Sequence, residues 1–166
     1  IGPTVEKIPA GLHTINVTTA DEMYNACIDI FEKMDWAIMS AAVSDYTPVK
    51  TEIQKIKKNN ENFVLELKKT KDILKKLGEI KNNNQYLIGF ALETNNEKDN
   101  ALAKLKTKNA DMIVLNSLND SGAGFGFNTN KISIFDKQGG EVHYESKPKA
   151  IVAADIVNSI IKYSNE

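Results

Sequence analysis

Short, continuous apolar runs along this chain are separated by stretches in which apolar residues recur every three or four positions. Continuous apolar runs are typical of strands buried on both faces of a parallel sheet, and the longer period is typical of amphipathic helices. This alternation predicts an α/β domain with a mostly parallel sheet. The predicted strands are 13–17, 36–42, 63–68, 86–91, 112–115, 132–135 and 142–144. The predicted helices are one that begins in a capping box at 19–22, then 72–81, 97–108 and 150–163.

The segment 55–69 departs from this alternation. It is rich in lysine and asparagine, and it ends in a strand whose pattern suits exposure of one face. We predict that this segment leaves the sheet as an excursion and does not contribute to the core.

Composition narrows the class of protein. The length of 166 residues suggests one domain with a core of its own, and the net charge of −1 gives no reason to expect a nucleic-acid partner. The longest apolar run is far too short to span a bilayer. The single cysteine, Cys27, excludes an internal disulfide and a cysteine metal cluster. We therefore expect a cytoplasmic protein that binds neither nucleic acid nor membrane.

The basic residues have an unusual composition, because all 21 of them are lysine. Without the guanidinium group of arginine, an anionic ligand must be held by lysines, backbone N–H groups and helix N-termini.

The stretch SLNDSGAGFGFNTNK (117–131) resembles a glycine-rich nucleotide loop at first sight. Its glycines are Gly122, Gly124 and Gly126, whereas a dinucleotide fingerprint needs G-x-G-x-x-G between a strand and a helix. A strand is predicted to come after this stretch, so no helix N-terminus is available to receive a pyrophosphate. We interpret the stretch as a connecting loop.

Candidate chemistry is expected beyond the carboxyl ends of the parallel strands, where open α/β sheets bind their ligands. Three such ends can be identified, at 40–48 (SAAVSDYTP), 90–96 (FALETNN) and 116–124 (NSLNDSGAG). In the first of them, Asp45 could accept a hydrogen bond from a ribose hydroxyl or hold a cation, and it could also be an ordinary turn residue.

Two sets of lysines could neutralise phosphate groups. Lys104 and Lys108 are four residues apart on a predicted helix and share a face. In an extended chain, Lys55 and Lys57 of the KIKK run point to the same side. For both sets, a solvated surface is the simpler interpretation of the pattern alone.

The motifs SAAVSDYTP, KIKK, KKTKDIL, LIGFALETNN, LKTKNADMIVLN and GFGFNTNKISIFD occur in an order that resembles the phosphopantothenoylcysteine synthetase family. The resemblance covers essentially the whole chain. It implies a Rossmann-like three-layer domain that forms a homodimer through strands extended from the sheet. In bacteria such a domain is often the C-terminal half of a bifunctional protein, fused to a flavin-dependent decarboxylase.

The resemblance also implies an activity, the joining of 4'-phosphopantothenate to L-cysteine. CTP is the expected co-substrate and Mg²⁺ the expected metal. CTP activates the carboxylate as an acyl-cytidylate with release of pyrophosphate, and the cysteine amine then displaces CMP.

Matching motifs imply the site residues. Lys55 matches a mobile-loop lysine associated with forming the cytidylate, so it is the expected catalytic residue. Thr70 and Lys71 stand where the family usually has Asn and Pro. The expected nucleotide-binding residues are Met39, Ser40, Ala41, Asp45, Lys55, Thr70, Lys71, Asp72, Ile73, Phe90, Lys104 and Lys108.

The family normally begins with a glycine-rich segment that supplies the first strand and helix and much of the triphosphate cradle. This chain starts at IGPTVEKIP, so we expect one domain over 1–166 that lacks this segment and is impaired in isolation. One alternative is a short-chain-type NAD(P) oxidoreductase, and another is a non-catalytic nucleotide-binding or dimerisation module. The oxidoreductase is disfavoured because no predicted helix carries a Tyr-x-x-x-Lys pair; Tyr24 is followed at that spacing by Ile28.

Overall fold

A computed structural model of the chain describes residues 1–4, 7–52, 54–57, 62–117 and 126–165. The chain divides into two compact units, each with hydrogen-bonded strands of its own. The first unit comprises Ile1–Asp29 and Ala41–Ile73, and the second comprises Ile30–Ser40 and Leu74–Glu166.

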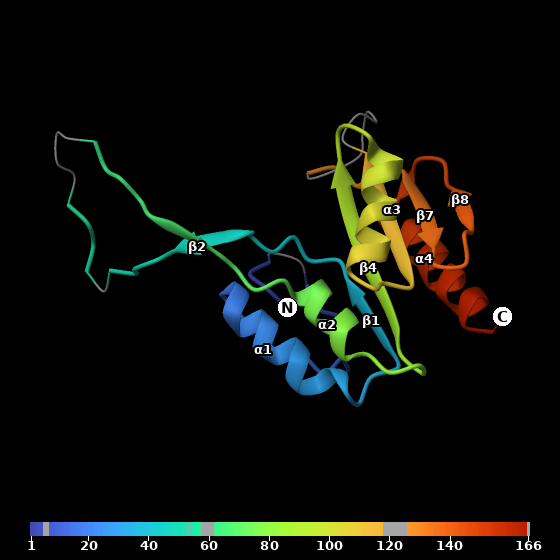
Figure 1. Ribbon diagram of the computed structural model, residues 1–166, viewed down its shortest axis with the longest axis horizontal. Helices are drawn as coiled ribbons and strands as arrows, with labels where there is room; N and C mark the ends of the chain where they lie inside the picture. The colour runs from blue at the N-terminus through green and yellow to red at the C-terminus, as the bar shows by residue number, and fades with distance from the viewer. Residues whose placement is uncertain (5–6, 53, 58–61, 118–125, 166) are drawn as a thin grey trace. The chain divides into compact units, whose positions relative to one another are not determined.

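The second unit is built on a five-stranded sheet in the order β1-β4-β5-β7-β8 (Figure 1). Strands β1, β4 and β5 run parallel, and β7 and β8 continue the sheet in antiparallel fashion. The predicted mostly parallel α/β sheet is thus confirmed, and the carboxyl ends of its three parallel strands share one edge. The strands are β1 (Trp36–Met39), β4 (Tyr86–Glu93), β5 (Met112–Ser117), β7 (Ile132–Asp136) and β8 (Glu141–His143).

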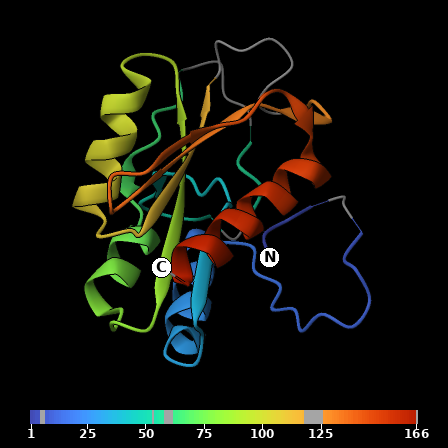
Figure 2. The same cartoon turned by 90° about the vertical axis from the view of Figure 1, so that its right-hand side faces the viewer.

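Helices cover both faces of this sheet and make three layers, with α2 and α3 on one face and α4 on the other (Figure 2). The approach of α2 to β4 is close, since a Cβ atom added at Gly89 would lie 2.7 Å from Leu74 Cδ2. On the opposite face, Val152, Ile156 and Ile160 of α4 pack in one buried cluster with apolar sheet residues. The helices are α2 (Ile73–Ile80), α3 (Glu97–Thr107) and α4 (Lys149–Ser164).

In the first unit, α1 (Ala20–Phe31) begins in the predicted capping box. Glu22 N donates to Thr19 Oγ1 at 3.1 Å, and Glu22 Oε2 accepts from Thr19 N at 3.1 Å. Thr18 N donates to the same carboxylate oxygen at 2.6 Å. The backbone hydrogen bond from Thr18, followed by the one from Thr19, holds the pKa of the Glu22 carboxyl below its ordinary value.

The predicted excursion from the sheet is present as a separate two-stranded ribbon in the first unit. Strand β2 (Tyr46–Pro48) pairs antiparallel with β3 (Leu67–Lys69). The predicted strand over 63–68 is shorter than expected, because Phe63, Val64 and Leu65 are exposed and lie outside any strand.

The prediction of a strand at 13–17 is wrong. A strand needs a hydrogen-bonded neighbour along its length, and among the described residues this segment pairs with Ile1 alone. Ile1 N donates to Ile15 O at 2.6 Å, and Val17 N donates to Ile1 O at 3.0 Å. The alternating pattern of this segment therefore corresponds to extended chain but not to a paired strand.

The glycine-rich stretch lies largely at 118–125, outside the described residues, so its interpretation as a connecting loop stays a prediction. The next described element along the chain is a strand and not a helix, as predicted, since β6 (Thr129–Asn130) and then β7 follow residue 126. Strand β6 pairs with β9 (Lys147–Pro148). Within the described ranges, no helix is both long and apolar enough to cross a membrane.

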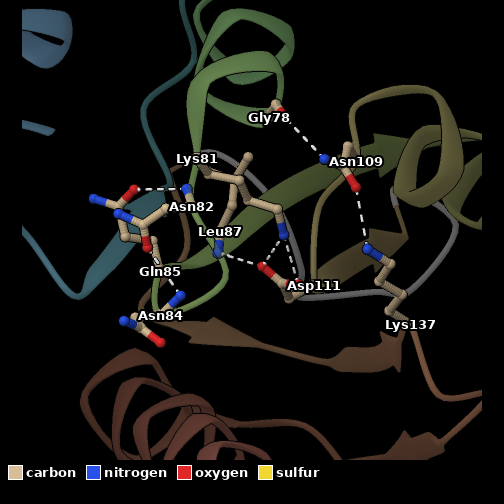
Figure 3. Close-up of polar contacts among 9 residues, drawn as sticks. All are labelled: Gly78, Lys81, Asn82, Asn84, Gln85, Leu87, Asn109, Asp111 and Lys137. Carbon is tan, nitrogen blue, oxygen red and sulfur yellow. Dashed lines mark hydrogen bonds and ion pairs between the residues drawn. The ribbon is translucent and has the colours of Figure 1, made fainter. Parts of the chain in front are cut away.

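A polar cluster fastens the amino ends of β4 and β5, at the end of the sheet away from the carboxyl edge (Figure 3). Lys81 Nζ contacts both carboxylate oxygens of Asp111, at 2.6 and 2.5 Å, and Leu87 N donates to Asp111 Oδ2 at 2.7 Å. Asn109 Nδ2 donates to the Gly78 carbonyl at 2.7 Å. These bonds tie the end of α2 to the amino ends of the two central strands.

Candidate functional site

The loop 41–48 in the first unit is fastened to the residues that precede α2. Thr70 Oγ1 donates to the Ser44 carbonyl at 2.7 Å, and Thr70 N donates to the Asp45 carbonyl at 2.9 Å. Tyr46 of β2 pairs with Lys69 of β3 directly beside these bonds. The structure therefore brings together two of the segments that the family resemblance assigned to one nucleotide site.

A cavity of about 810 Å³ lies beside this loop within the first unit. Ala41, Ser44 and Thr70 line it together with Thr18 and Lys7. Small-molecule sites commonly measure about 300–1,000 Å³. The described residues that line the cavity include no carboxylate, so the lining suits a neutral polar or an anionic ligand. Thr18 N and Thr19 N, which directly precede α1, already donate to the Glu22 carboxylate, so these two backbone N–H groups are not available to a ligand.

The other predicted residues before α2 have different surroundings. Lys71 Nζ lies 3.1 Å from Asp21 Oδ1 and 4.9 Å from the centre of the Tyr24 ring, so its ammonium group faces α1. Asp72 is exposed and directly precedes α2, whereas Ile73 is buried. Of the four residues at 70–73, Thr70 is the one that lines the cavity.

The predicted catalytic lysine, Lys55, is exposed on the extended segment that follows β2. Lys57 is exposed on the same segment, and Lys58 lies outside the described residues. Both described ammonium groups are thus accessible to solvent and to a phosphate-bearing ligand.

In the second unit, Met39 ends the first parallel strand and Ser40 comes directly after it. Met39 lies opposite Gly89 in the sheet, and Ser40 N donates to Ile38 O at 3.2 Å. Phe90 occupies the next strand, β4, and is half-buried. The structure places these residues at or near the carboxyl edge, as expected from the chain order.

Lys104 and Lys108, the two lysines predicted to share a helix face, have different surroundings. Lys104 Nζ donates to the Phe90 carbonyl at 2.7 Å, so this partly buried ammonium group is fastened to β4. Lys108 is the C-cap of α3, at the end of the helix that leads into the amino end of β5. Its carbonyl lies beside Gly78, in the structural cluster away from the carboxyl edge.

Sequence reasoning identified the strand end at 116–124 but did not single out Asn116. The side-chain Oδ1 atom of Asn116 is buried and has no hydrogen-bond partner among the described residues. A further cavity of about 460 Å³ borders it within the second unit. The sequence alone does not indicate whether the side-chain oxygen of an asparagine at a strand end finds a hydrogen-bond donor.

A further group missed by sequence reasoning lies on β7 and β8. Ser133 Oγ is 2.8 Å from His143 Nδ1, and His143 Nε2 is 3.0 Å from Glu141 Oε1. Glu141 Oε2 accepts from Lys98 at 2.5 Å, and this bond is the main reason that the pKa of Glu141 is lowered. The chain of contacts joins β8 to α3, so we assign it a structural role.

The remaining candidate chemistry is limited. Desolvation by burial raises the pKa of the Cys27 thiol, which makes it a poor nucleophile at neutral pH, as expected from its place on the apolar side of α1. In the part of the chain that the structure describes, no three His, Cys, Asp or Glu side chains come together to hold a metal ion.

The three layers, the parallel strands and the polar segments at their carboxyl edge define a Rossmann-like α/β domain. The chain belongs to the family described as the DNA/pantothenate metabolism flavoprotein C-terminal domain, which it matches over residues 1–163. This membership confirms the predicted resemblance.

Individual relatives agree with this assignment. The chain is 48% identical over 162 residues to a cysteine/cysteine sulfinic acid decarboxylase of an unknown prokaryotic organism, covering 97% of the chain and 45% of that protein. It is 40% identical over 166 residues to the coenzyme A biosynthesis bifunctional protein CoaBC of Bacillus subtilis strain 168, covering 99% of the chain and 41% of that protein. The crystal structure of the C-terminal domain of a CoaBC protein matches with a TM-score of 0.81 at 34% identity, over 99% of the chain and 73% of that structure. The chain thus spans less than half the length of these curated relatives.

Proposed function

We propose that the chain is the synthetase domain of a coenzyme A biosynthetic enzyme. It ligates 4'-phosphopantothenate to L-cysteine, and CTP is cleaved to CMP and pyrophosphate in the reaction. The observation that carries this proposal is its 40% identity to Bacillus subtilis CoaBC over the whole chain. The cavity beside the loop 41–48 supports it, because that loop and Thr70 are segments that the resemblance assigns to the nucleotide.

The proposed reaction has two steps. An oxygen of the phosphopantothenate carboxylate attacks the α-phosphorus of CTP, and pyrophosphate leaves with the electron pair of the broken anhydride bond. The cysteine amine then attacks the activated carbonyl carbon, an amide bond forms, CMP leaves, and the nitrogen loses a proton. Neither step requires a nucleophile from the protein, which is compatible with the raised pKa of Cys27.

The chain's contribution is positioning and charge neutralisation. Negative charge accumulates on the phosphates as pyrophosphate leaves, and an ammonium group placed beside them lowers that barrier. We assign this role to Lys55, whose exposed side chain is free of the core. Removal of one such donor typically costs a factor of about 10²–10³ in rate.

Magnesium enters the proposal as part of the nucleotide. The described residues offer no three-ligand metal cage, and Mg²⁺ usually binds through substrate phosphates with one or two carboxylates. A Mg²⁺–CTP complex is therefore the proposed substrate, with Asp45 as the carboxylate in the loop 41–48.

We further propose a homodimer formed through the β2–β3 excursion. Phe63, Val64 and Leu65 expose 67%, 88% and 51% of their surface, which is unusual for three consecutive apolar side chains of a monomer. A flavin-dependent decarboxylase domain in the same protein is the proposed fusion partner, because the CoaBC relatives are bifunctional and longer than this chain.

A second candidate function is decarboxylation of cysteine or cysteine sulfinic acid, favoured by the name of the 48% identical relative. The two candidates differ in their products. The ligase consumes CTP and forms an amide, whereas the decarboxylase releases CO₂ from the amino acid without a nucleotide.

Calorimetric titration of the chain with Mg²⁺–CTP, ATP and NADPH tests the proposal. We expect CTP to bind, and Lys55→Ala and Asp45→Asn to weaken that binding. Lys76→Ala is the control, since Lys76 is on α2 and pairs with Glu79. Binding of NADPH alone would favour the oxidoreductase, and CO₂ release from cysteine sulfinate without nucleotide would favour the decarboxylase.

A further inference from the structure

Ser133 and His143 face each other across β7 and β8, the paired antiparallel strands at one edge of the central sheet (Figure 1). Ser133 Oγ lies 2.8 Å from His143 Nδ1. Glu141 is two residues from His143 on β8, so both side chains lie on the same face of the sheet, and Glu141 Oε1 is 3.0 Å from His143 Nε2. Besides joining β8 to α3, this cluster therefore places a hydroxyl, an imidazole and a carboxylate in one line of contacts.

Glu141 determines which ring nitrogen of His143 carries the hydrogen. The hydrogen bond from Lys98 is the main reason that the pKa of Glu141 is lowered, so its carboxylate is charged at neutral pH and can only accept hydrogen bonds. In a neutral imidazole, Nε2–H must therefore donate to Glu141, which leaves the lone pair on Nδ1. The Ser133 hydroxyl donates to that lone pair, so Nδ1 is placed to accept the serine proton.

Phe135 and the Glu141 carboxylate fix the orientation of the imidazole ring. The ring centres of Phe135 and His143 are 6.4 Å apart with an interplanar angle of 84°, which is an edge-to-face contact. Glu141 is itself held by Lys98 of α3, at 2.5 Å. A hydroxyl in contact with a base that is oriented by a third group is the arrangement that activates a serine as a nucleophile.

A cavity of about 800 Å³ within the second unit gives a small molecule access to this pair. Ser133 and His143 line it, together with the turn between β4 and α3 and the end of β5. Small-molecule sites commonly measure about 300–1,000 Å³. Most of the described lining residues carry hydroxyl, amide or charged groups, and Leu115 and Ile132 are the aliphatic ones. The described lining includes none of the residues predicted to bind the nucleotide, so this cavity is distinct from the proposed ligase site.

Donors for a developing negative charge line the same cavity. Lys131 contributes an ammonium group, and Asn95 and Asn96 contribute side-chain amides. Asn96 is the N-cap of α3, but its side chain makes no capping hydrogen bond to the helix. Ammonium and amide groups stabilise the oxyanion that forms when a nucleophile attacks a carbonyl carbon. The carboxylates of Glu97 and Glu145, which also line the cavity, disfavour a substrate that is itself anionic.

We propose that Ser133 is a catalytic nucleophile and that the chain hydrolyses neutral esters of small carboxylic acids in this cavity. Ser133 Oγ attacks the ester carbonyl carbon and its proton passes to His143 Nδ1; the alcohol then leaves with the electron pair of the broken ester bond and takes that proton. Water attacks the acyl-serine and gives a proton to Nδ1, the bond between the acyl group and Ser133 Oγ breaks, and Oγ takes the proton back as the acid leaves. Glu141 is a positioning residue, since it acts through His143. This activity goes beyond the proposed ligation and does not depend on it.

Covalent labelling with a fluorophosphonate tests the nucleophile, because an activated serine oxygen attacks its phosphorus and displaces fluoride. We expect one phosphonyl group per chain, on Ser133, when the peptides are analysed by mass spectrometry. His143→Gln removes the base and should slow labelling by about 10²-fold, at the low end of general-base effects because the ring is solvent-exposed. Ser159→Ala is the matched control and should be labelled like the wild type, since Ser159 Oγ contacts Tyr144 and the Asp155 carbonyl instead of an imidazole.

Hydrolysis of p-nitrophenyl acetate tests the complete reaction. The wild type should release p-nitrophenolate over many turnovers, whereas acetylation of surface lysines stops when they are consumed. Ser133→Ala should lower kcat/KM by about 10²-fold. Glu141→Gln keeps an acceptor oxygen for Nε2–H but removes the charge, so it should lower kcat by about tenfold and leave KM unchanged, which the loss of a merely structural contact would not do.

An unlabelled Ser133 in the folded wild type overturns the proposal, and so does labelling of His143→Gln as fast as that of the wild type. Hydrolysis by Ser133→Ala at the wild-type rate overturns it equally. Circular dichroism establishes that each variant is folded, which we expect because His143 is 66% exposed and the cluster lies on the surface of the sheet. CTP binding should be the same in all these variants, so a failure of the proposed ligation leaves this test unaffected.

Discussion

Lys81 and Asp111 form a buried ion pair at the amino ends of the central strands, with Nζ 2.6 and 2.5 Å from the two carboxylate oxygens. Their side chains are 8% and 11% exposed. The carboxylate also accepts from Leu87 N, so one aspartate connects α2, β4 and the start of β5. The pair lies at the opposite end of the sheet from the carboxyl edge, which makes it a structural anchor.

Removing the charge of this anchor should be strongly destabilising. Asp111→Asn leaves the buried Lys81 ammonium group without a counter-charge, and breaking a buried pair in this way typically costs about 3–5 kcal/mol. Urea unfolding measures the loss. Lys98→Met is the control, because Lys98 pairs with Glu141 at the surface and is 57% exposed, so its loss should cost less than about 1 kcal/mol. Equal effects of the two substitutions would contradict the anchoring role.

Gly78 is required by close packing of backbone against backbone. A Cβ atom at this position would lie 1.8 Å from the Lys108 carbonyl oxygen. Alanine gains about 1 kcal/mol over glycine in a helix interior, but this clash should outweigh the gain. We expect Gly78→Ala to lower the free energy of unfolding by at least about 2 kcal/mol.

Gly2→Ala is the matched comparison for Gly78→Ala, since its Cβ would meet only Met23 Cε at 3.6 Å. Thermal unfolding of both variants distinguishes a local clash from a general intolerance of alanine. A Gly78→Ala protein with the melting temperature of the wild type would show that α2 and the C-cap of α3 are farther apart than described.

The cap of α1 should make stability depend on pH. The pKa of Glu22 is lowered below its ordinary value of 4.5 in the folded state, chiefly by the backbone hydrogen bond from Thr18. A lowered folded-state pKa stabilises the protein above the unfolded-state pKa, and this contribution is lost as pH falls through the lowered value. The difference in unfolding free energy between wild type and Glu22→Gln should therefore be largest near neutral pH and shrink below pH 4.5.

Urea titrations between neutral pH and about pH 3 measure this difference, because they bracket the ordinary range of a glutamate pKa. The pKa of Glu141 is also lowered, but Glu141 is present in both the wild type and Glu22→Gln. Its contribution to the pH dependence therefore cancels when the two unfolding free energies are subtracted. A difference that does not change with pH would mean that the carboxylate charge is not what caps the helix.

The proposed dimer depends on the apolar stretch near β3. We expect Val64→Glu to shift the protein toward monomer in sedimentation experiments, because a charge on an apolar interface is left without a partner. Val142→Glu is the control, since Val142 is an apolar residue of β8 that is 48% exposed. Dissociation by both substitutions, or by neither, would contradict an interface formed by the β2–β3 excursion.

Elements with a strong local pattern of apolar and polar residues could be predicted from the sequence, whereas the pairing of strands could not. The buried strands at β4 and β5 and the capping box of α1 have strong local signals, and they form where expected. The segment 13–17 has the alternation of a strand, but in the part of the chain that the structure describes it pairs only with Ile1, since pairing depends on a neighbour and not on local pattern. Long-range pairing is the part of a sheet that a local pattern does not encode.

The candidate site was predictable only in part for the same reason. The order of motifs implied that the loop 41–48 and Thr70 belong together, and two hydrogen bonds join them. The contact between Lys104 and the Phe90 carbonyl depends on how α3 packs on β4, and helical spacing carries no information about that packing. Asn116 Oδ1 has no hydrogen-bond partner among the described residues, and its neighbours Leu92 and Ile132 come from two other strands, which a local pattern does not encode either.

The central claim is tested most directly by ligation in a chimeric CoaBC. The 166 residues of this chain replace the 40% identical segment of the Bacillus subtilis protein, and formation of 4'-phosphopantothenoylcysteine is measured with release of pyrophosphate from CTP. We predict CTP-dependent ligation by the chimeric protein, a loss of about 10²–10³ in rate with Lys55→Ala, and near-normal activity with Lys76→Ala. A folded chimeric protein that retains decarboxylase activity but forms no phosphopantothenoylcysteine would contradict the claim.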